Sequence, residues 1–260
     1  SNYSISYVES SFFITPAALT VTADSGLSKV YGATDPTLTY TISGFQGSDT
    51  EGSLDTPVII SRVAGENVGD YLITPSGAAD SNYSISYVTS IFAITPTVLT
   101  VTANSGLSKA YGATDPTLTY TISGFIGSDT EASLDTRVKI SRVAGENVGN
   151  YLITPSGAMD SKYSIIFVTS TFAITPAALA VTADSGFSKV YGTSLDPILT
   201  YTISGFIGSD NEATLDRPVI ISRAAGENAG TYVITPSGAA KTNYTINFVT
   251  STFIITPVAL

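Results

Sequence analysis

The chain has 260 residues, of which 43% are hydrophobic, and its 11 basic and 21 acidic side chains give a net charge of −10. It contains no cysteine and no histidine, which excludes disulfides, thiolate nucleophiles, a histidine base and the usual zinc ligands. The acidic balance argues against nucleic-acid partners, and no apolar run is long enough for membrane insertion.

An internal repeat dominates the sequence. The segment that begins at Ser1 recurs from Ser81, Ser161 and Thr242, a period of about 80 residues. This period exceeds the roughly 20–45 residues of a solenoid unit and suits a small domain with its own core. We divide the chain into residues 1–16, the C-terminal strands of a truncated preceding repeat; 17–96, repeat 1; 97–176, repeat 2; 177–257, repeat 3; and 258–260, the start of a next repeat.

Two strands are predicted within residues 1–16, at Ser4–Val8 and Phe12–Ile14. They have no core of their own, so we expect them to be poorly ordered or to pack on a neighbouring chain. Repeat 1 then shows alternation of apolar and polar residues, which is typical of half-buried strands. Its predicted strands are Leu19–Ala23, Leu38–Ser43, Pro57–Arg62, Tyr71–Thr74, Tyr83–Val88 and Phe92–Thr95.

A capping-box pattern interrupts the strands, with Ser48 followed three residues later by Glu51. It predicts one or two helical turns that end near Asp55. Strands, a short helix and further strands are the order of a β-grasp, although the same strand count suits a sandwich. We expect a mostly β (small α+β) fold of tandem β-grasp-like modules of about 80 residues, arranged as an elongated rod.

The connections between repeats are short. Each follows an Ile-Thr-Pro sequence, as at Ile94-Thr95-Pro96, and only two residues separate Pro96 from Leu99 of the next predicted strand. Proline excludes helix for itself and for its predecessor, so the connection is extended rather than a flexible tether. Neighbouring repeats are therefore expected to touch each other.

Four sequence motifs of repeat 1 recur in closely similar form in the other two repeats: Lys29-Val30-Tyr31-Gly32, Asp35-Pro36-x-Leu38-Thr39-Tyr40, Ala64-Gly65-Glu66-Asn67-Val68-Gly69-x-Tyr71 and Ile94-Thr95-Pro96. Together they resemble the MBG domain of the YGX type, and the resemblance covers almost the whole chain. It implies mostly-β, β-grasp-like modules in tandem arrays of large bacterial surface and secreted proteins, including adhesins. It carries over no catalytic or ligand residues.

Two recurring groups of residues invite a chemical interpretation. Asp49, Glu51 and Asp55 could bind calcium, but acids are also favoured at a helix N-terminus and the spacing lacks a calcium-loop pattern. Lys29 and Asn67 recur as well and could form an isopeptide bond, although an exposed lysine beside a turn is commoner. In both cases we prefer the structural interpretation.

Three further patterns have ordinary explanations. Thr20 and Thr22 form a threonine ladder of a kind that can bind ice, but threonine is also favoured on a solvated strand. Strand tyrosines could stack on sugars, but usually serve packing; they are Tyr40, Tyr71, Tyr83 and Tyr87. Asn2, Asn82 and Asn243 lie in N-glycosylation motifs, which we attribute to chance. We predict no catalytic, cofactor-binding or metal-binding residues and no enzyme activity.

These observations favour a structural stalk or spacer of an exported bacterial adhesin or extracellular fibre, located at the cell surface or secreted. Its partners are expected to be adjacent repeats of the same chain. One alternative is a module that binds a surface glycan or protein by avidity. Another is a filament-forming subunit, whose copies assemble end to end by strand exchange through residues 1–16.

Overall fold

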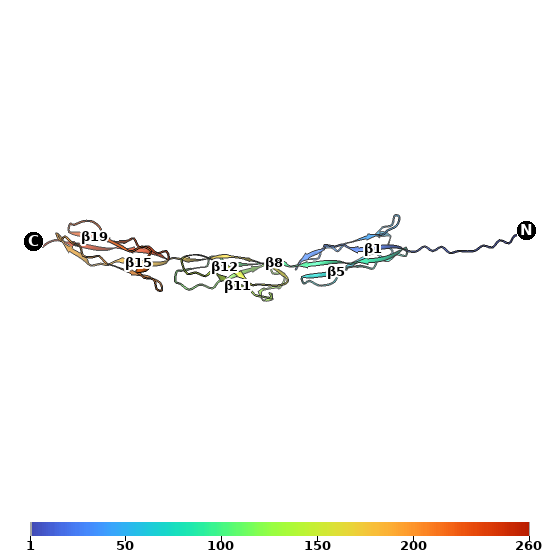
Figure 1. Cartoon of the computed structure of the whole chain (residues 1–260), viewed down its shortest axis with the longest axis horizontal. Helices are drawn as coiled ribbons and strands as arrows, with labels where there is room; N and C mark the ends of the chain where they lie inside the picture. The colour runs from blue at the N-terminus through green and yellow to red at the C-terminus, as the bar shows by residue number, and fades with distance from the viewer. Residues whose placement is uncertain (1, 260) are drawn as a thin grey trace. The chain divides into compact units, whose positions relative to one another are not determined.

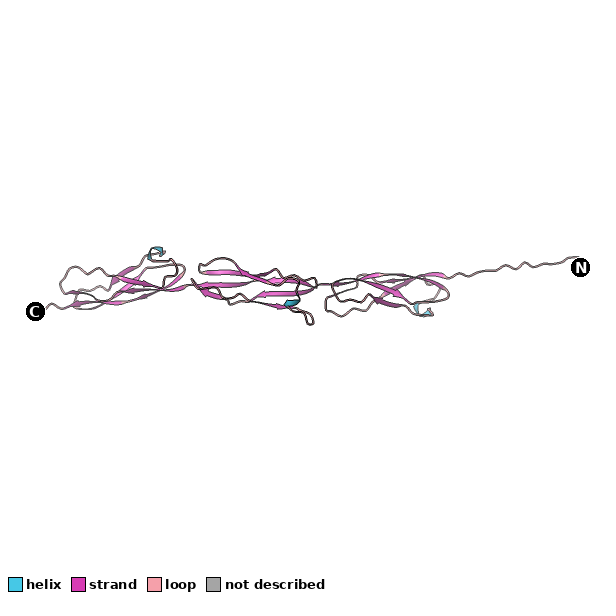
Figure 2. Cartoon of the chain, turned by 90° about the horizontal axis from the view of Figure 1, so that it is seen from below, coloured by secondary structure: helices cyan, strands magenta, loops and turns pink. Residues whose placement is uncertain are grey.

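The computed structural model describes residues 2–259, which consist mainly of strands and loops (Figures 1 and 2). The chain forms two compact units. Unit 1 contains repeat 1 and part of repeat 2, and comprises Ser1–Thr100, Ile122–Arg137 and Gly157–Ile166. Unit 2 contains the rest of repeat 2 and repeat 3, and comprises Val101–Thr121, Val138–Ser156 and Phe167–Leu260.

Repeat 1 consists of two sheets. In the first, β1 (Ala17–Ala23) lies between β3 (Tyr40–Ser43), which is antiparallel to it, and β6 (Tyr83–Val88), which is parallel. The second sheet has the order β2-β7-β5-β4. Its strands are β2 (Ser28–Val30), β4 (Ile59–Arg62), β5 (Gly69–Ser76) and β7 (Ser90–Thr95). Figure 1 labels β1 and β5, one strand from each sheet.

The two sheets are joined by a nearly continuous strand. Only Thr89 separates β6 from β7, so the chain leaves the first sheet and enters the second within one residue. β7 then pairs with β2 in parallel and with β5 antiparallel. A single stretch from Tyr83 to Thr95 therefore contributes to both sheets.

The core lies between the sheets because strand side chains alternate from one face to the other. In β1, Leu19, Val21 and Ala23 are buried. Ala23 packs against Phe92 and its neighbours from the second sheet. Phe92 is fully buried, and its truncation to alanine would cost about 3–5 kcal/mol.

Repeats 2 and 3 have the same two strand orders as repeat 1. The strands of repeat 2 are β8 (Thr97–Ala103), β9 (Ser108–Ala110), β10 (Tyr120–Ser123), β11 (Lys139–Arg142), β12 (Gly149–Ser156), β13 (Tyr163–Val168) and β14 (Ser170–Thr175). Those of repeat 3 are β15 (Ala177–Ala183), β16 (Phe187–Val190), β17 (Tyr201–Ser204), β18 (Ile220–Arg223), β19 (Gly230–Ser237), β20 (Tyr244–Val249) and β21 (Ser251–Thr256).

The mostly-β class is confirmed, but the β-grasp arrangement and its helix are not. The predicted helical turns are replaced in each repeat by one three-residue 3-10 turn, drawn in cyan in Figure 2. These turns are Glu51–Ser53, Glu131–Ser133 and Glu212–Thr214. None of them has a buried residue, so each lacks the apolar face that would hold a helix on a sheet. Two sheets in each repeat correspond to the sandwich alternative.

Several predicted strand boundaries also change. Leu38 packs on the core outside any strand, and the short β2 was not predicted. β5 runs through Pro75, which pairs with Ile60 of β4. Its pairing with β7 ends at Ile73, so one edge of β5 is free there and can accommodate a proline.

The strands predicted within residues 1–16 are absent from the described residues 2–16, which have no regular secondary structure. Their apolar side chains are exposed, as in Tyr3, Ile5 and Phe12. Strands need a hydrogen-bonding partner, and this segment has none in the described chain. The start of a next repeat, placed at 258–260, remains a prediction, and residue 260 lies outside the described residues.

Candidate functional site

Each repeat contains a cluster of four charged side chains, which we call the ion cluster. In repeat 1 it consists of Lys29, Asp35, Arg62 and Glu66. Lys29 Nζ lies 2.7 Å from Asp35 Oδ1 and also contacts Glu66. Arg62 binds Asp35 through two nitrogens, at 2.5 and 3.1 Å, and Glu66 at 2.9 Å. The guanidinium group lies over the rings of Phe92 and Tyr71, at 5.0 and 5.3 Å.

The ion cluster holds every member in its charged form. Hydrogen bonds from Arg62 and then from Lys29 lower the pKa of Asp35 to about 2. The hydrogen bond to Asp35 in turn raises the pKa of Lys29. Lys29 is almost fully buried, with 8% of its surface exposed. A protonated lysine is no nucleophile, so this geometry favours a structural role over covalent chemistry.

The same cluster recurs in the other two repeats. Its members there are Lys109, Asp115, Arg142 and Glu146, and Lys189, Asp196, Arg223 and Glu227. Among the described residues, no hydrogen bond joins Lys29 to Asn67, the partner considered for an isopeptide bond. The carbonyl of Asn67 instead accepts a hydrogen bond from the Tyr71 hydroxyl.

A second feature joins residues of different repeats within unit 1, and we call it the tyrosine latch. Tyr31 of repeat 1 donates a hydrogen bond to Asp129 Oδ2 of repeat 2, at 3.0 Å. Tyr163 donates to the same oxygen at 2.8 Å, and the two rings meet edge to face at 5.7 Å. Lys162 Nζ lies 5.3 Å from the centre of the Tyr31 ring. The Asp129 carboxylate thus accepts hydrogen bonds from two tyrosine hydroxyls and lies near the ammonium group of Lys162.

Gly32 completes this latch by allowing close approach. Its φ is +82°, a conformation that favours glycine. A Cβ added at this position would meet Ile126 Cγ2 of repeat 2 within 2.3 Å. Ile126 also donates its backbone N–H to the Tyr163 hydroxyl, at 3.0 Å. In the Tyr-Gly pair, the tyrosine therefore donates a hydrogen bond to the next repeat. The adjacent glycine, which has no side chain, leaves room for the isoleucine of that repeat.

Unit 2 contains an equivalent latch. Tyr111 and Tyr244 donate to Asp210 Oδ2 at 3.0 and 2.7 Å, and their rings lie 5.4 Å apart. A Cβ on Gly112 would meet Ile207 within 2.1 Å. Tyr111 also packs against the buried cluster of Ala177, Leu179 and Tyr244. The latch of repeat 2 is therefore continuous with the core of repeat 3.

The third copy of the Tyr-Gly pair has no such partner in the described chain. Tyr191 is half exposed, and nothing lies within 4 Å of a Cβ built on Gly192. Tyr31 and Tyr111 also pack against the buried cores of their own repeats, whereas Tyr191 is absent from the core cluster of repeat 3. The recurrence of the Tyr-Gly pair was the sequence signal for this site, although Asp129 and Tyr163 were not identified as its partners.

Burial and hydrogen bonding shift the pKa values of the latch groups Tyr163, Tyr244 and Asp129. Burial is the main cause that raises the pKa of Tyr163, and likewise that of Tyr244, to about 12. The hydrogen bond from Tyr163 is the largest cause that lowers the pKa of Asp129. Tyr163 and Tyr244 therefore stay neutral donors and the Asp129 carboxylate a charged acceptor, so the bond from Tyr163 to Asp129 is charge-assisted.

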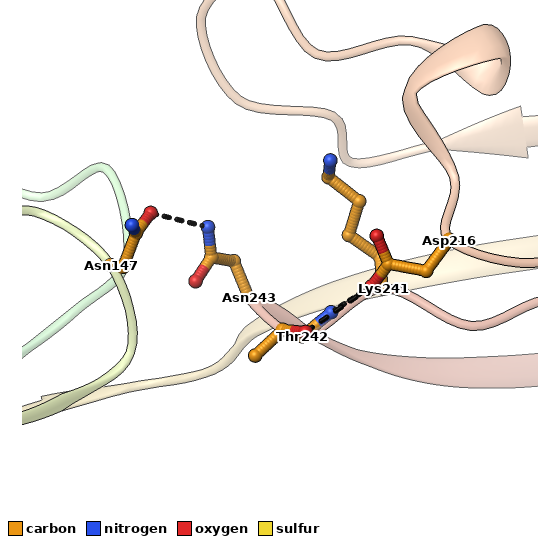
Figure 3. Close-up of a pocket in the computed structure, with 5 residues that line it drawn as sticks. All are labelled: Asn147, Asp216, Lys241, Thr242 and Asn243. Carbon is orange, nitrogen blue, oxygen red and sulfur yellow. Dashed lines mark hydrogen bonds between the residues drawn. The ribbon is translucent and has the colours of Figure 1, made fainter.

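A pocket of about 280 Å³ lies beside the second latch (Figure 3). Figure 3 shows Asn147 facing Asn243, whose Nδ2 donates to Asn147 Oδ1 at 3.0 Å. Asn243 Oδ1 also accepts the backbone N–H of Val148 at 2.9 Å. On the other wall, Asp216 accepts the backbone N–H of Thr242 at 2.9 Å. Much of the polar lining is therefore already paired within the protein.

The acidic residues considered for calcium each have another role. Asp49 accepts the hydroxyl of Tyr83 at 2.7 Å, Glu51 accepts that of Tyr40, and Asp55 accepts the backbone N–H of Ser81 at 3.3 Å. In residues 2–259 no three acids come together as a group that could hold a metal ion. Asp129 of repeat 2 and Asp210 of repeat 3 correspond to Asp49 of repeat 1. These two residues are the acceptors of the two latches.

The remaining candidates are also engaged in local contacts. Thr20 Oγ1 lies 3.1 Å from Ser86 Oγ on the neighbouring strand. Tyr83 is buried, and the Tyr87 hydroxyl donates to the carbonyl of Ala78 at 3.0 Å. Asn82 donates its backbone N–H to Asp80 at 2.7 Å. Each of these residues therefore has at least one contact within repeat 1.

The sequence was compared with known families and proteins. The MBG domain (YGX type) matches residues 19–93, 99–173 and 179–254. The chain belongs to this family. The three matches form a tandem array across almost the whole chain, and no curated protein matches the sequence.

Three solved structures share a distant likeness with the MBG array. The titin domains I67–I69 (an E-to-A variant) have 9% identity and a TM-score of 0.28, covering 95% of this chain and 98% of that one. The three N-terminal domains of the bacteriophage RB49 outer capsid protein Hoc have 13% identity and a TM-score of 0.24, and the match covers 94% of this chain and 99% of that one. Drosophila N-cadherin EC1-3 has 9% identity and a TM-score of 0.20, and the match covers 75% of this chain and 79% of that one. At such low TM-scores no property of these proteins is carried over.

The Tyr-Gly pair of the MBG (YGX type) repeats thus lies in the latch, whereas the lysine two residues before it lies in the ion cluster. One motif, Lys29-Val30-Tyr31-Gly32, therefore serves the interior of its own repeat and the contact with the next. No helix among the described residues is long and apolar enough to cross a membrane.

Proposed function

We propose that the MBG array is a non-catalytic stalk or spacer of an exported bacterial adhesin or extracellular fibre, at the cell surface or secreted. Its task is to separate other parts of a larger assembly, with the repeats in line as a rod. The observation that carries the proposal is the recurrence of the tyrosine latch: Tyr31 with Asp129, and Tyr111 with Asp210. A linker that only tethers domains needs no such contact.

Two further observations support a structural role. The ion cluster is present in all three repeats, and it keeps its lysine protonated rather than reactive. The recurring acids serve as hydrogen-bond acceptors inside the protein. Charged side chains that form internal contacts in every copy are typical of a structural protein.

Small-angle scattering of the 260-residue chain tests this proposal. Three repeats of roughly 35 Å each in line give a particle on the order of 100 Å long, with a narrow cross-section. The variant Asp129→Asn/Asp210→Asn should scatter as a more flexible particle, whereas Asp49→Asn, which touches no latch, should not. A compact particle, or equal flexibility of all three proteins, contradicts the proposal. Protease shaving of intact cells that carry the parent protein tests its export.

A second candidate is self-association through residues 2–16, and a specific observation favours it. The apolar side chains of this segment are highly exposed; they are Tyr3, Ile5, Tyr7, Val8, Phe12, Phe13 and Ile14. Exposed segments of this kind seek strand partners. If they join copies into filaments, deletion of residues 2–16 should convert the polymer into monomers in light scattering. Polymer that survives the deletion refutes this candidate.

A further inference from the structure

The connectivity of repeat 1 places its two ends far apart along one direction. Tension in a tandem chain enters at Ala17, the first residue of β1, and leaves at Thr95, the last residue of β7. Ala17 is in register with Tyr83, the first residue of β6. Thr95 ends the stretch that Tyr83 begins, up to about 40 Å further at the rise of an extended strand. The pulling direction therefore follows the strands.

Under such tension β1 and β6 are pulled in opposite directions. They are parallel and paired over six positions, from Ala17↔Tyr83 to Thr22↔Val88. Because they run the same way, a backward pull on Ala17 and a forward pull on Thr95 slide one strand along the other. The bonds of the pair are then loaded together, and none opens before the rest.

We propose that each repeat is a mechanical clamp that bears tension along the chain, with the parallel β1–β6 pair of repeat 1 as its load-bearing element. This function goes beyond that of a spacer, which needs only length. The clamp lies within a single repeat, so it does not depend on the tyrosine latches.

The positions of the loaded strands strengthen the clamp. β1 is the central strand of its sheet, between β3 and β6, and β7 is an inner strand of the other sheet, between β2 and β5. β6 is an edge strand of the first sheet, but it continues through a single residue into β7, so both ends of the loaded path lie in inner strands. β7 is further anchored by the fully buried Phe92, against which the Arg62 guanidinium packs.

Repeat 3 reproduces this arrangement within unit 2. β15 pairs in parallel with β20 over the six positions from Ala177↔Tyr244 to Thr182↔Val249. β20 leads into β21 through the single residue Thr250, and β21 lies between β16 and β19. The clamp is therefore a property of the repeat and not of one copy.

Single-molecule pulling from two pairs of attachment points tests the clamp in the same folded chain. The chain has no cysteine, so handles can be attached at introduced cysteines. Ser11→Cys with Thr95→Cys loads repeat 1 in the native direction. Ser11→Cys with Ser81→Cys pulls β1 and β6 apart at the same end, so that their bonds open one after another. All three positions are exposed.

We expect a several-fold higher unfolding force for the Ser11/Thr95 pair than for the Ser11/Ser81 pair at the same loading rate. Forced unfolding is governed by the unfolding rate and not by equilibrium stability, so the direction of pulling decides the result. Thermal unfolding of both variants without load provides the control for intact folding. Equal forces in the two geometries, or a higher force for the Ser11/Ser81 pair, would overturn the inference.

Discussion

Tyr31 donates a hydrogen bond to Asp129, a residue 98 positions later in the sequence, and the same chemistry links Tyr111 to Asp210. In both cases a second tyrosine of the later repeat, Tyr163 or Tyr244, shares the carboxylate. The acceptor carboxylate is thus hydrogen-bonded within its own repeat, independently of its contact with the Tyr-Gly pair of the preceding repeat. Such a preformed acceptor loses little conformational freedom when the contact forms.

A double-mutant cycle measures the contribution of this bond. Tyr31→Phe removes only the hydroxyl, Asp129→Asn removes the charge of the acceptor, and the double variant gives their coupling. We expect a coupling free energy of about 1 kcal/mol in calorimetric unfolding. Tyr191→Phe is the matched control, because the Tyr191 hydroxyl has no hydrogen-bond partner in the described chain. A coupling near zero would mean that the bond does not stabilise the contact.

Gly32→Ala separates backbone strain from steric overlap. Both Gly32 and Gly192 have a positive φ, at +82° and +88°, but only Gly32 faces a side chain, that of Ile126. Gly192→Ala should cost about 1 kcal/mol from strain alone, and Gly32→Ala distinctly more. Ile126→Ala in the Gly32→Ala background should recover part of the difference in unfolding midpoint. If the two glycine variants behave alike, Ile126 does not restrict this position.

The ion clusters predict a loss of stability in acid. The pKa of Asp35, Asp115 and Asp196 is lowered to about 2 in the folded chain, whereas an unfolded aspartate has a pKa of about 4. The contribution of the ion clusters to the free energy of unfolding is therefore complete above a pH of about 4. It declines as the pH falls toward about 2. Urea unfolding at a series of pH values measures the decline.

The control is a chain in which these three aspartates are replaced by asparagine. It should be less stable at neutral pH and should lose less of its remaining stability over the same acid range. If its unfolding free energy follows the same pH slope as that of the parent chain, the clusters are not responsible for the acid sensitivity.

Much of the strand pattern could be read from the sequence because burial in strands has a period of two. Tyr83–Val88 was predicted with the bounds that β6 has, and the alternation around Leu19 and Val21 predicted β1. The helix was predicted from a local signal, the capping box at Ser48, which also suits a single turn. Without a buried apolar face, that signal did not produce a helix.

The pairing of strands and the latch could not be predicted for a different reason. Which strand lies beside β1 depends on contacts between positions far apart, as in Ala17↔Tyr83. The hydrogen bonds of the latch combine one residue of repeat 1 with two of repeat 2, and each of the three has an ordinary local explanation. The recurrence of Tyr31-Gly32 showed that the pair mattered but not what it touches.

Repeat 2 takes part in both latches and contributes a different half to each of them. It supplies Asp129 and Tyr163 to the contact with Tyr31, and Tyr111 to the contact with Asp210. A gene that lost or gained one whole copy of such a unit would still encode matching surfaces at the new joint. The length of the array can therefore change in evolution by recombination, in steps of one repeat, while the chemistry of its joints stays the same.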